Sequence, residues 1–303
     1  MRFPFEMFLP RLRETELPNA DCLVQRGSRR HAAATAMRVR RPSRVGYDGL
    51  EIAPFTLSAS PEKISTANAV RIRAVVEASG LVVTGLHWLL VKPEGLSLTD
   101  PDAGVRNRTL AVMIHLIGLC AELGGSVLVH GSPKQRQIAP EETHAVALAR
   151  LQDALAQVAL AAARVGVTYC IEPLSRRETS LVNTVAEAAE LVRSIDHPNL
   201  RTMIDCSAAG LTETDPIPSL IDRWLPTGLI AHVQVNDPNR RGPGQGEMKF
   251  APILAALKRH NYTGTIAVEP FDYSPDGPTT AAFSAGYLRG LLETLHIPLD
   301  NSQ

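Results

Sequence analysis

Residues 229–247 read LIAHVQVNDPNRRGPGQGE, and this stretch decides how the rest of the chain is interpreted. Its first half predicts a short strand in which apolar and polar residues alternate. The polar members of the alternation are His232, Gln234 and Asn236. At a period of two they share one face, and polar groups inside a buried strand are costly unless something pairs with them. A metal ion and a polar substrate would do so, and the Pro- and Gly-rich half predicts a shaped loop.

Short apolar segments alternate with helical patterns from residue 49 to residue 295. The predicted strands are 49–53, 81–87, 126–130, 167–172, 201–205, 229–235 and 265–269. The predicted helices are 61–79, 102–123, 141–165, 184–194, 218–224, 251–260 and 280–295. Strict alternation predicts an α/β protein with a parallel sheet. One further unit from the N-terminal region gives the (β/α)₈ TIM barrel, whose length of about 250 residues or more also fits. The alternative is an open doubly wound sheet, but no GxGxxG turn follows an early strand.

The first 45 residues do not look like a first β-α unit, because they are rich in arginine and repeatedly interrupted by proline. The best strand candidate there is Phe3–Leu9, and a short helix is predicted over His31–Val39. We therefore divide the chain into an atypical N-terminal segment, residues 1–45, and a TIM barrel over residues 46–303. The barrel is expected to have a poorly matching first β-α unit, and one hypothesis is that residues 1–45 are an aberrant or divergent sequence.

Composition excludes several functional classes. The chain has 31 Lys and Arg against 31 Asp and Glu, so its net charge gives no reason to expect nucleic acid or an anionic membrane as a partner. No apolar run approaches the roughly 20 residues that span a bilayer. The four cysteines lack CxxC spacing, and most lie in apolar segments typical of reduced, buried thiols. With no apolar segment after the first charged residues, these features predict a cytoplasmic enzyme.

Four consecutive predicted strands end in a residue that can bind a metal. These residues are Glu172, Asp205, Gln234 and Glu269. The carboxyl ends of TIM-barrel strands converge on one pocket, where three carboxylates would repel one another unless a cation is present. An all-oxygen set suits Mn²⁺ or Mg²⁺, with Co²⁺ as a substitute. Taken singly, each carboxylate is more often a helix cap or an ion-pair partner, and Gln234 is more often a core amide. The prediction of a metal site therefore depends on all four residues ending consecutive strands.

The strand ends IEPL, ID, HVQ and VEPF, together with the loop NRRGPGQG, resemble the xylose-isomerase-like superfamily of sugar isomerases and epimerases. The pattern is nearest to the ketose 3-epimerase and hydroxypyruvate isomerase branch, over about residues 46–295. The resemblance implies one divalent metal ion (Mn²⁺, Mg²⁺ or Co²⁺) bound by Glu172, Asp205, Gln234 and Glu269. The ketose epimerases carry His at the Gln234 position and the hydroxypyruvate isomerases carry Gln.

The resemblance also implies the chemistry. The metal chelates an α-hydroxy carbonyl compound and stabilises the enediolate formed when a carbon-bound proton is removed. Glu172 and Glu269 resemble the pair of catalytic carboxylates that exchange this proton. The sequence leaves open whether the result is inversion of one centre or transfer between neighbouring carbons.

Five further residues are candidates for substrate binding. By family position Glu178 and Arg240 would contact substrate oxygens, while His87 and Trp88 resemble a substrate-facing pair and His232 shares the inward face of Gln234. Simpler interpretations compete with these. Arg240 would be a solvated loop charge, His232 a hydrogen-bonded core histidine, and Trp88 part of the core.

One departure from the family concerns specificity. The epimerases place a substrate-binding His three residues after the metal-binding Asp, where this chain has Ala208, so ketohexose specificity does not carry over. The leading hypothesis is a divalent-metal-dependent isomerase or epimerase of a small sugar or hydroxy-keto compound. The alternatives are a lyase or dehydratase acting on a keto-inositol or 3-keto-glycoside, and a catalytically impaired barrel. A DNA-repair endonuclease with three zinc ions needs more strand-end histidines than this chain offers.

The expected partner is a small-molecule sugar or keto acid without a phosphate group, since no Gly-rich phosphate loop with a paired Lys stands out. Oligomerisation is implied by the resemblance alone, and the sequence does not set the number of subunits.

Overall fold

Eight parallel strands close into a barrel in the order β1 to β8. The computed structural model describes residues 5–8 and 46–296. The strands are β1 (Phe5–Phe8), β2 (Gly49–Ile52), β3 (Val82–Leu86), β4 (Val127–His130), β5 (Thr168–Ile171), β6 (Leu200–Asp205), β7 (Ile230–Val235) and β8 (Ile266–Val268). The predicted (β/α)₈ barrel is therefore confirmed.

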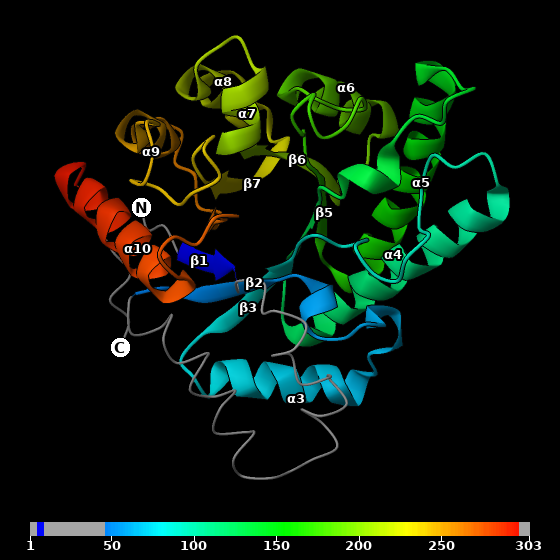
Figure 1. Ribbon diagram of the computed structural model, residues 1–303, viewed down its shortest axis with the longest axis horizontal. Coiled ribbons are helices and arrows are strands. Elements are labelled where there is room, and N and C mark those ends of the chain that lie inside the picture. Colours follow the sequence, from blue (N-terminus) through cyan, green and yellow to red (C-terminus); the bar gives the residue numbers. More distant parts are fainter. Residues whose placement is uncertain (1–4, 9–45, 297–303) are drawn as a thin grey trace.

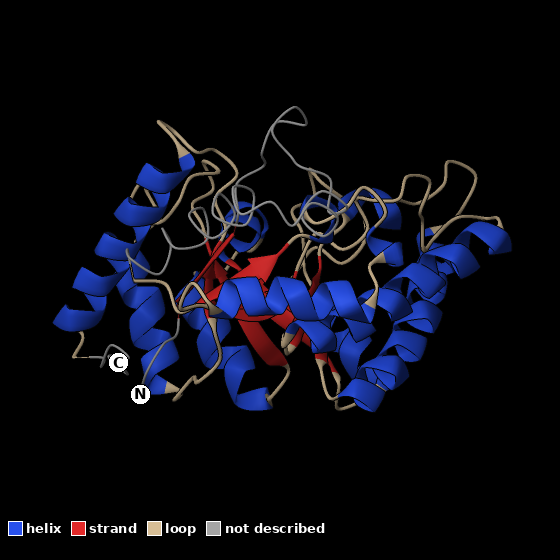
Figure 2. Ribbon diagram, turned by 90° about the horizontal axis from the view of Figure 1, so that it is seen from below, coloured by secondary structure: helices blue, strands red, loops and turns tan. Residues whose placement is uncertain are grey.

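Helices surround the strands on the outside (Figures 1 and 2). The α-helices are α3 (Thr66–Glu77), α4 (Ala103–Leu123), α5 (His144–Val165), α6 (Val185–Ile195), α7 (Cys206–Thr212), α8 (Ile217–Trp224), α9 (Phe250–Arg259) and α10 (Gly277–Thr294). Short 3₁₀ turns occur at Pro54–Thr56, Pro61–Lys63, Pro133–Arg136 and Leu225–Thr227. All the helices predicted from residue 61 onward are present, with shifted ends.

The ends shift where capping side chains fix the first turn. Ser65 accepts a hydrogen bond from the Asn68 amide, so the regular helix predicted from residue 61 begins at Thr66 after a separate turn. Helix α7 was not predicted. It begins directly after β6 because Asp205, the last residue of that strand, also caps the helix by accepting from the Ala208 amide.

Strand β1 closes the barrel by pairing with β2 on one side and β8 on the other. Its residues fall within the predicted strand 3–9. The helix predicted over residues 31–39 lies outside the described residues, and the division of the chain at residue 45 stays a prediction.

The barrel has two hydrophobic cores, as the period of two in the strands requires. The large core lies between the strands and the helices and includes Leu50, Leu128 and Val233, all fully buried. The small core lies inside the barrel and consists of Val129, Cys170 and Met203. Other inward positions of the described strands are polar, including Glu51, His232 and Gln234, and these positions lead to the candidate site.

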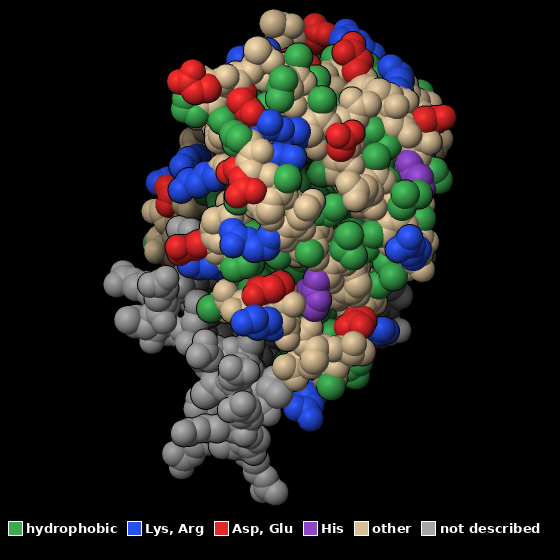
Figure 3. Space-filling model, turned by 90° about the vertical axis from the view of Figure 1, so that its right-hand side faces the viewer, with side chains coloured by type: hydrophobic (Ala, Val, Ile, Leu, Met, Phe, Trp, Pro, Cys, Tyr) green, Lys and Arg blue, Asp and Glu red, His purple; other side chains and the backbone are tan. Residues whose placement is uncertain are grey.

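Helix α5 is, within the described part of the chain, the one helix long and apolar enough to cross a membrane by length and composition. In the structure it packs against α4, α6 and β5 and contributes Leu151, Leu155 and Val158 to the large core. On the face shown in Figure 3, basic side chains lie among acidic ones instead of gathering into one patch.

Gly85 lets β3 and β4 approach each other. A Cβ atom at this position would lie 2.3 Å from the backbone oxygen of Val127, and a backbone atom cannot move aside as a flexible side chain can. We expect Gly85→Ala to lower the free energy of unfolding by about 2 kcal/mol or more. Gly118→Ala in α4 is the matched control, because nothing lies within 4 Å of its Cβ and alanine favours a helix by about 1 kcal/mol. Urea denaturation would measure both, and a neutral Gly85→Ala would contradict this account of the β3–β4 contact.

Candidate active site

Three carboxylates meet at the carboxyl end of the barrel. Glu172 directly follows β5, Asp205 ends β6, and Glu269 directly follows β8. One oxygen of each lies within 4.8 Å of the others. The three residues are only 7%, 5% and 4% exposed. The sequence predicted this convergence, and the described residues place the three side chains together.

The cluster carries strong electrostatic strain. Burial raises the pKa of Glu172 well above its usual range, and the charges of Glu269 and Asp205 raise it further. Burial and Glu269 raise the pKa of Asp205 from 3.8 to about 8. Burial and the nearby Glu51 raise the pKa of Glu269 from 4.5 to about 8. Without a cation, the folded protein therefore favours protonated carboxyl groups here.

Asp205 is the most tightly held of the three. One carboxylate oxygen accepts from the Ala208 amide at 2.6 Å, and the other accepts from Asn236 Nδ2 at 2.9 Å. The Asn236 side-chain oxygen in turn accepts from the Ser207 amide at 2.8 Å. Asn236 is fully buried and is the last polar residue of the alternation that begins at His232.

Glu269 is oriented by the two residues that directly follow β3. Trp88 Nε1 donates to Glu269 Oε1 at 3.0 Å, and His87 Nδ1 lies 3.3 Å from the same oxygen. The hydrogen bond from Trp88 lowers the pKa of Glu269 against the effect of burial. The Trp88 ring also lies 5.9 Å from the ring of Phe271, which follows Glu269 by two residues.

Glu172 is held through its backbone and by close contact. Arg136, a fully buried residue, donates from Nη2 to the backbone oxygen of Glu172 at 2.7 Å, and its charge lowers the pKa of the Glu172 carboxyl. A Cβ at Gly131 would lie 2.3 Å from Glu172 Oε2, so this carboxylate occupies the space that a side chain at position 131 would fill.

Gln234 lies beside Asp205, because the two residues are register partners on β6 and β7. Its side chain is fully buried, and neither side-chain atom has a hydrogen-bond partner of full geometry among the described residues. The amide nevertheless lies close enough to Glu51 to lower the pKa of that carboxyl. With the three carboxylates, a buried amide oxygen beside Asp205 would give an oxygen donor set that could hold a divalent cation.

The remaining predicted residues occupy different places. His232 Nε2 lies 3.3 Å from Glu51 Oε2 inside the barrel, which favours the core-histidine interpretation. Glu178 is exposed, accepts from the Ser175 amide and hydroxyl, and still raises the pKa of Asp205. Arg240 is exposed and holds its guanidinium 5.4 Å from the centre of the Phe271 ring.

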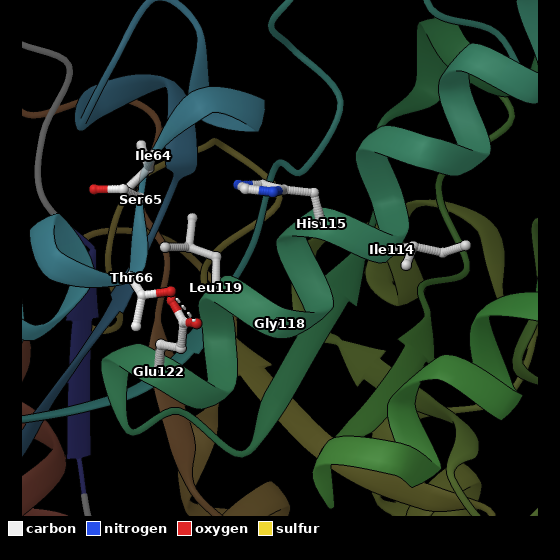
Figure 4. A pocket seen from close by; sticks show the side chains of 8 residues that line it. All are labelled: Ile64, Ser65, Thr66, Ile114, His115, Gly118, Leu119 and Glu122. Carbon is white, nitrogen blue, oxygen red and sulfur yellow. Dashed lines mark hydrogen bonds between the residues drawn. The ribbon is translucent and has the colours of Figure 1, made fainter.

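Two buried residues of the site were not identified from the sequence. Glu51 is 1% exposed, and a charged residue in the four-residue strand β2 was a signal that could have found it. Arg136 lies in a Pro-containing turn after β4, where no periodicity marks it. A separate pocket, on the outer wall between the start of α3 and α4, contains none of the clustered carboxylates (Figure 4).

Comparison with known proteins shows the family of the chain. The family model described as xylose isomerase-like TIM barrel matches residues 39–291. A D-psicose 3-epimerase from Ruminiclostridium cellulolyticum is 26% identical over 239 residues, which is 77% of each chain. A 2-oxo-tetronate isomerase from Pectobacterium atrosepticum is 31% identical over 134 residues, covering 43% of this chain and 48% of that protein. The crystal structure of 3-keto-D-glucoside 4-epimerase from E. coli superimposes with a TM-score of 0.75 at 20% identity, covering 95% of this chain and all of that one.

The chain belongs to the xylose isomerase-like TIM barrel family. Its relatives include ketose 3-epimerases and a 2-oxo-tetronate isomerase, the branch that the strand-end motifs predicted.

The raised pKa values predict how the metal-free protein responds to pH. The folded state binds protons on Asp205 and Glu269 up to about pH 8, whereas the unfolded chain releases them near pH 4. The stabilisation that the folded state gains from these bound protons is therefore complete at low pH. It is lost as the pH rises through 8. We expect the free energy of unfolding in the presence of a chelator to fall between about pH 5 and pH 8. Asp205→Asn should reduce the slope because an amide does not titrate.

Urea denaturation across this pH range measures the slope. Asp215→Asn serves as the control, because Asp215 pairs with Arg223 on the surface, away from the cluster. An Asp205→Asn protein with the wild-type slope would show that the cluster does not carry the strain described above.

Proposed function

We propose that this protein is a divalent-metal-dependent isomerase or epimerase of a small sugar or hydroxy-keto compound. The observation that carries the proposal is the cluster of Glu172, Asp205 and Glu269, three buried carboxylates with oxygens within 4.8 Å of one another. Like charges at that distance raise their own pKa values unless a cation is shared between them. With Gln234 they form an oxygen set suited to Mn²⁺, Mg²⁺ or Co²⁺.

A bound divalent cation would act as a Lewis acid that stabilises negative charge developing on the oxygens of an α-hydroxy carbonyl substrate. The protein's own residues would then move the proton. Glu172 and Glu269 come from opposite sides of the cluster in strand order, β5 and β8, so each can reach a different face of a substrate held between them. Asp205, fixed by two hydrogen bonds, would serve as a ligand without taking a proton.

The surroundings of Glu269 favour a proton-transfer role. Trp88 Nε1 and His87 Nδ1 both contact Oε1, so the orientation of this carboxyl group is set before substrate binds. Burial keeps the pKa of Glu269 raised, to about 8 without a cation, and a carboxylate with a raised pKa is a stronger base.

An aromatic surface lies beside the cluster. Trp88 and Phe271 contact each other, and the Arg240 guanidinium lies over the Phe271 ring. Such rings pack against the apolar face of a sugar, and a guanidinium at their edge could donate to its hydroxyl oxygens. The relatives named above act on sugars and a hydroxy-keto acid by their names, and this supports the same substrate class here.

The donor set distinguishes this proposal from a zinc endonuclease. In the part of the chain that the structure describes, the group of residues able to hold a metal is made of Glu172, Asp205 and Glu269 and includes no histidine. Zinc sites favour nitrogen and sulfur ligands.

Metal content is the first test. Purified wild-type protein is expected to bind about one Mn²⁺, Mg²⁺ or Co²⁺ per chain, and Glu172→Gln or Glu269→Gln should weaken binding at least tenfold because each removes a charged ligand. Asp222→Asn is the control for loss of a carboxylate elsewhere. A wild-type protein that stays free of metal during titration would contradict the proposal.

Proton exchange tests the chemistry. Metal-loaded protein incubated in D₂O with ketoses or hydroxypyruvate is expected to incorporate deuterium at the carbon beside the carbonyl. Glu172→Gln and Glu269→Gln should each reduce exchange by about 100-fold or more, the typical contribution of an acid or base. NMR of the product distinguishes inversion at one carbon from transfer between two. Exchange that is undiminished in both variants would remove the assigned roles.

A further inference from the structure

Two residues beside the candidate site have a strained backbone. Trp88, in the loop after β3, has a φ of 50°, and Ser132, in the turn after β4, has a φ of 38°. This left-handed conformation is uncommon for a residue with a side chain, and it persists only where the surrounding contacts hold it. The contacts of these two residues therefore indicate what the strain is used for.

The turn after β4 is built around Glu172. Gly131 leaves the space that Glu172 Oε2 occupies, since a Cβ at residue 131 would lie 2.3 Å from that oxygen. Arg136, at the other end of the turn, donates to the Glu172 backbone oxygen at 2.7 Å. Ser132 lies between them and is 3% exposed, and its backbone oxygen accepts from the Gln135 amide at 3.1 Å. Ser132 therefore has a fixed place next to one of the two proposed catalytic carboxylates.

The Ser132 hydroxyl connects this turn to the loop that contains Trp88. Ser132 Oγ accepts a hydrogen bond from the Leu90 amide at 3.2 Å. Leu90 is fully buried, and a buried amide that loses its acceptor is costly. Two residues before Leu90, Trp88 Nε1 donates to Glu269 Oε1 at 3.0 Å. Two hydrogen bonds, joined by the backbone of residues 88–90, thus connect Ser132 to the second proposed catalytic carboxylate.

We infer that Ser132 is a positioning residue whose hydroxyl holds the Trp88 indole against Glu269. The inference rests on the proposed function, in which Glu269 moves a proton. Through this contact, the turn that encloses Glu172 also fixes the orientation of Glu269. The two carboxylates would then keep a constant relative position although they follow different strands, β5 and β8.

The role belongs to the hydroxyl and not to the whole turn. Arg136 contacts Glu172 without using the Ser132 side chain. The later part of the loop after β3 is held separately, because the Leu98 amide donates to the Gln135 backbone oxygen at 2.8 Å. Loss of the hydroxyl should therefore release the segment around Trp88 and leave these other contacts in place.

The indole N–H of Trp88 reports this contact directly. The chain has two tryptophans, so NMR of the ¹⁵N-labelled full-length protein gives two indole signals, which Trp224→Phe assigns. Ser132→Ala is expected to speed exchange of the Trp88 N–H with D₂O about tenfold or more, the effect of one lost buried hydrogen bond on local opening. Ser65→Ala is the matched control. It also removes a hydroxyl that accepts from a backbone amide, that of Asn68, and should leave this exchange unchanged.

Ser132→Gly is the second variant, for the case in which Ser132→Ala does not fold. Glycine adopts a φ of 38° without strain and also lacks the hydroxyl, so it separates the hydroxyl from the backbone conformation. Circular dichroism confirms that each variant is folded. Faster exchange in Ser132→Gly would support the inference. Wild-type exchange in folded Ser132→Gly would overturn it, because position 132 would then supply only a backbone conformation.

Catalysis tests whether Ser132 acts through Trp88. Deuterium incorporation by the metal-loaded protein is expected to fall about tenfold in Ser132→Ala, because a small misplacement of a reacting group costs this much or more. In the Trp88→Phe background, which lacks the indole donor, the same change should lower the rate less than about twofold. Equal losses in both backgrounds would refute the inference.

The design distinguishes two failures. A wild-type protein without exchange activity would overturn the proposed function. The indole measurement needs no turnover, so unchanged exchange of the Trp88 N–H in the Ser132 variants would overturn the inference alone.

Discussion

Repulsion among three buried carboxylates is the constraint on which the site depends. Glu172, Asp205 and Glu269 bring their oxygens within 4.8 Å of one another while each is less than a tenth exposed. Burial alone disfavours the charged form of each group, and proximity adds to the cost. The surrounding hydrogen bonds offset only part of this. Arg136 lowers the pKa of Glu172 and Trp88 lowers that of Glu269, yet both pKa values remain raised. A cluster strained in this way is suited to a cation, because one divalent ion attracts all three carboxylates at once and offsets two of their three negative charges.

The barrel tolerates this arrangement because different residues of each strand provide the hydrophobic packing and the polar site. Every second residue of a strand points outward into the large core, where apolar side chains supply the stabilisation. The inward residues are then free to be polar. Inside the barrel, Met203 pairs in register with His232, so the small apolar core of Val129, Cys170 and Met203 borders the Glu51–His232 pair directly. At the level of Met203 and His232, the interior is thus polar toward β2 and β7 and apolar toward β4, β5 and β6.

Much of this could be predicted from the sequence, for identifiable reasons. Alternating β and α patterns predict a barrel, and barrel geometry brings strand ends together, so Glu172, Asp205 and Glu269 followed from their positions alone. Glu51 could not be assigned a role, because its partner His232 lies on β7, which is not a neighbour of β2, and only closure of the barrel brings the two residues into contact. Arg136 and the Trp88 hydrogen bond depend on irregular backbone, including a positive φ at Trp88. Helix α7 was not predicted because it begins directly after β6 with no loop between them. Asp205 ends the strand, caps the helix and belongs to the carboxylate cluster.

Burial of the Glu51–His232 pair inside the barrel costs free energy of hydration. Two ionisable groups that are almost fully buried lose hydration, and their mutual attraction rarely exceeds that loss. Hydrophobic side chains of the same volume would stabilise this part of the barrel at least as well. The buried pair is therefore a cost to stability, and it lies in the same polar part of the interior as Gln234, whose amide lowers the pKa of Glu51.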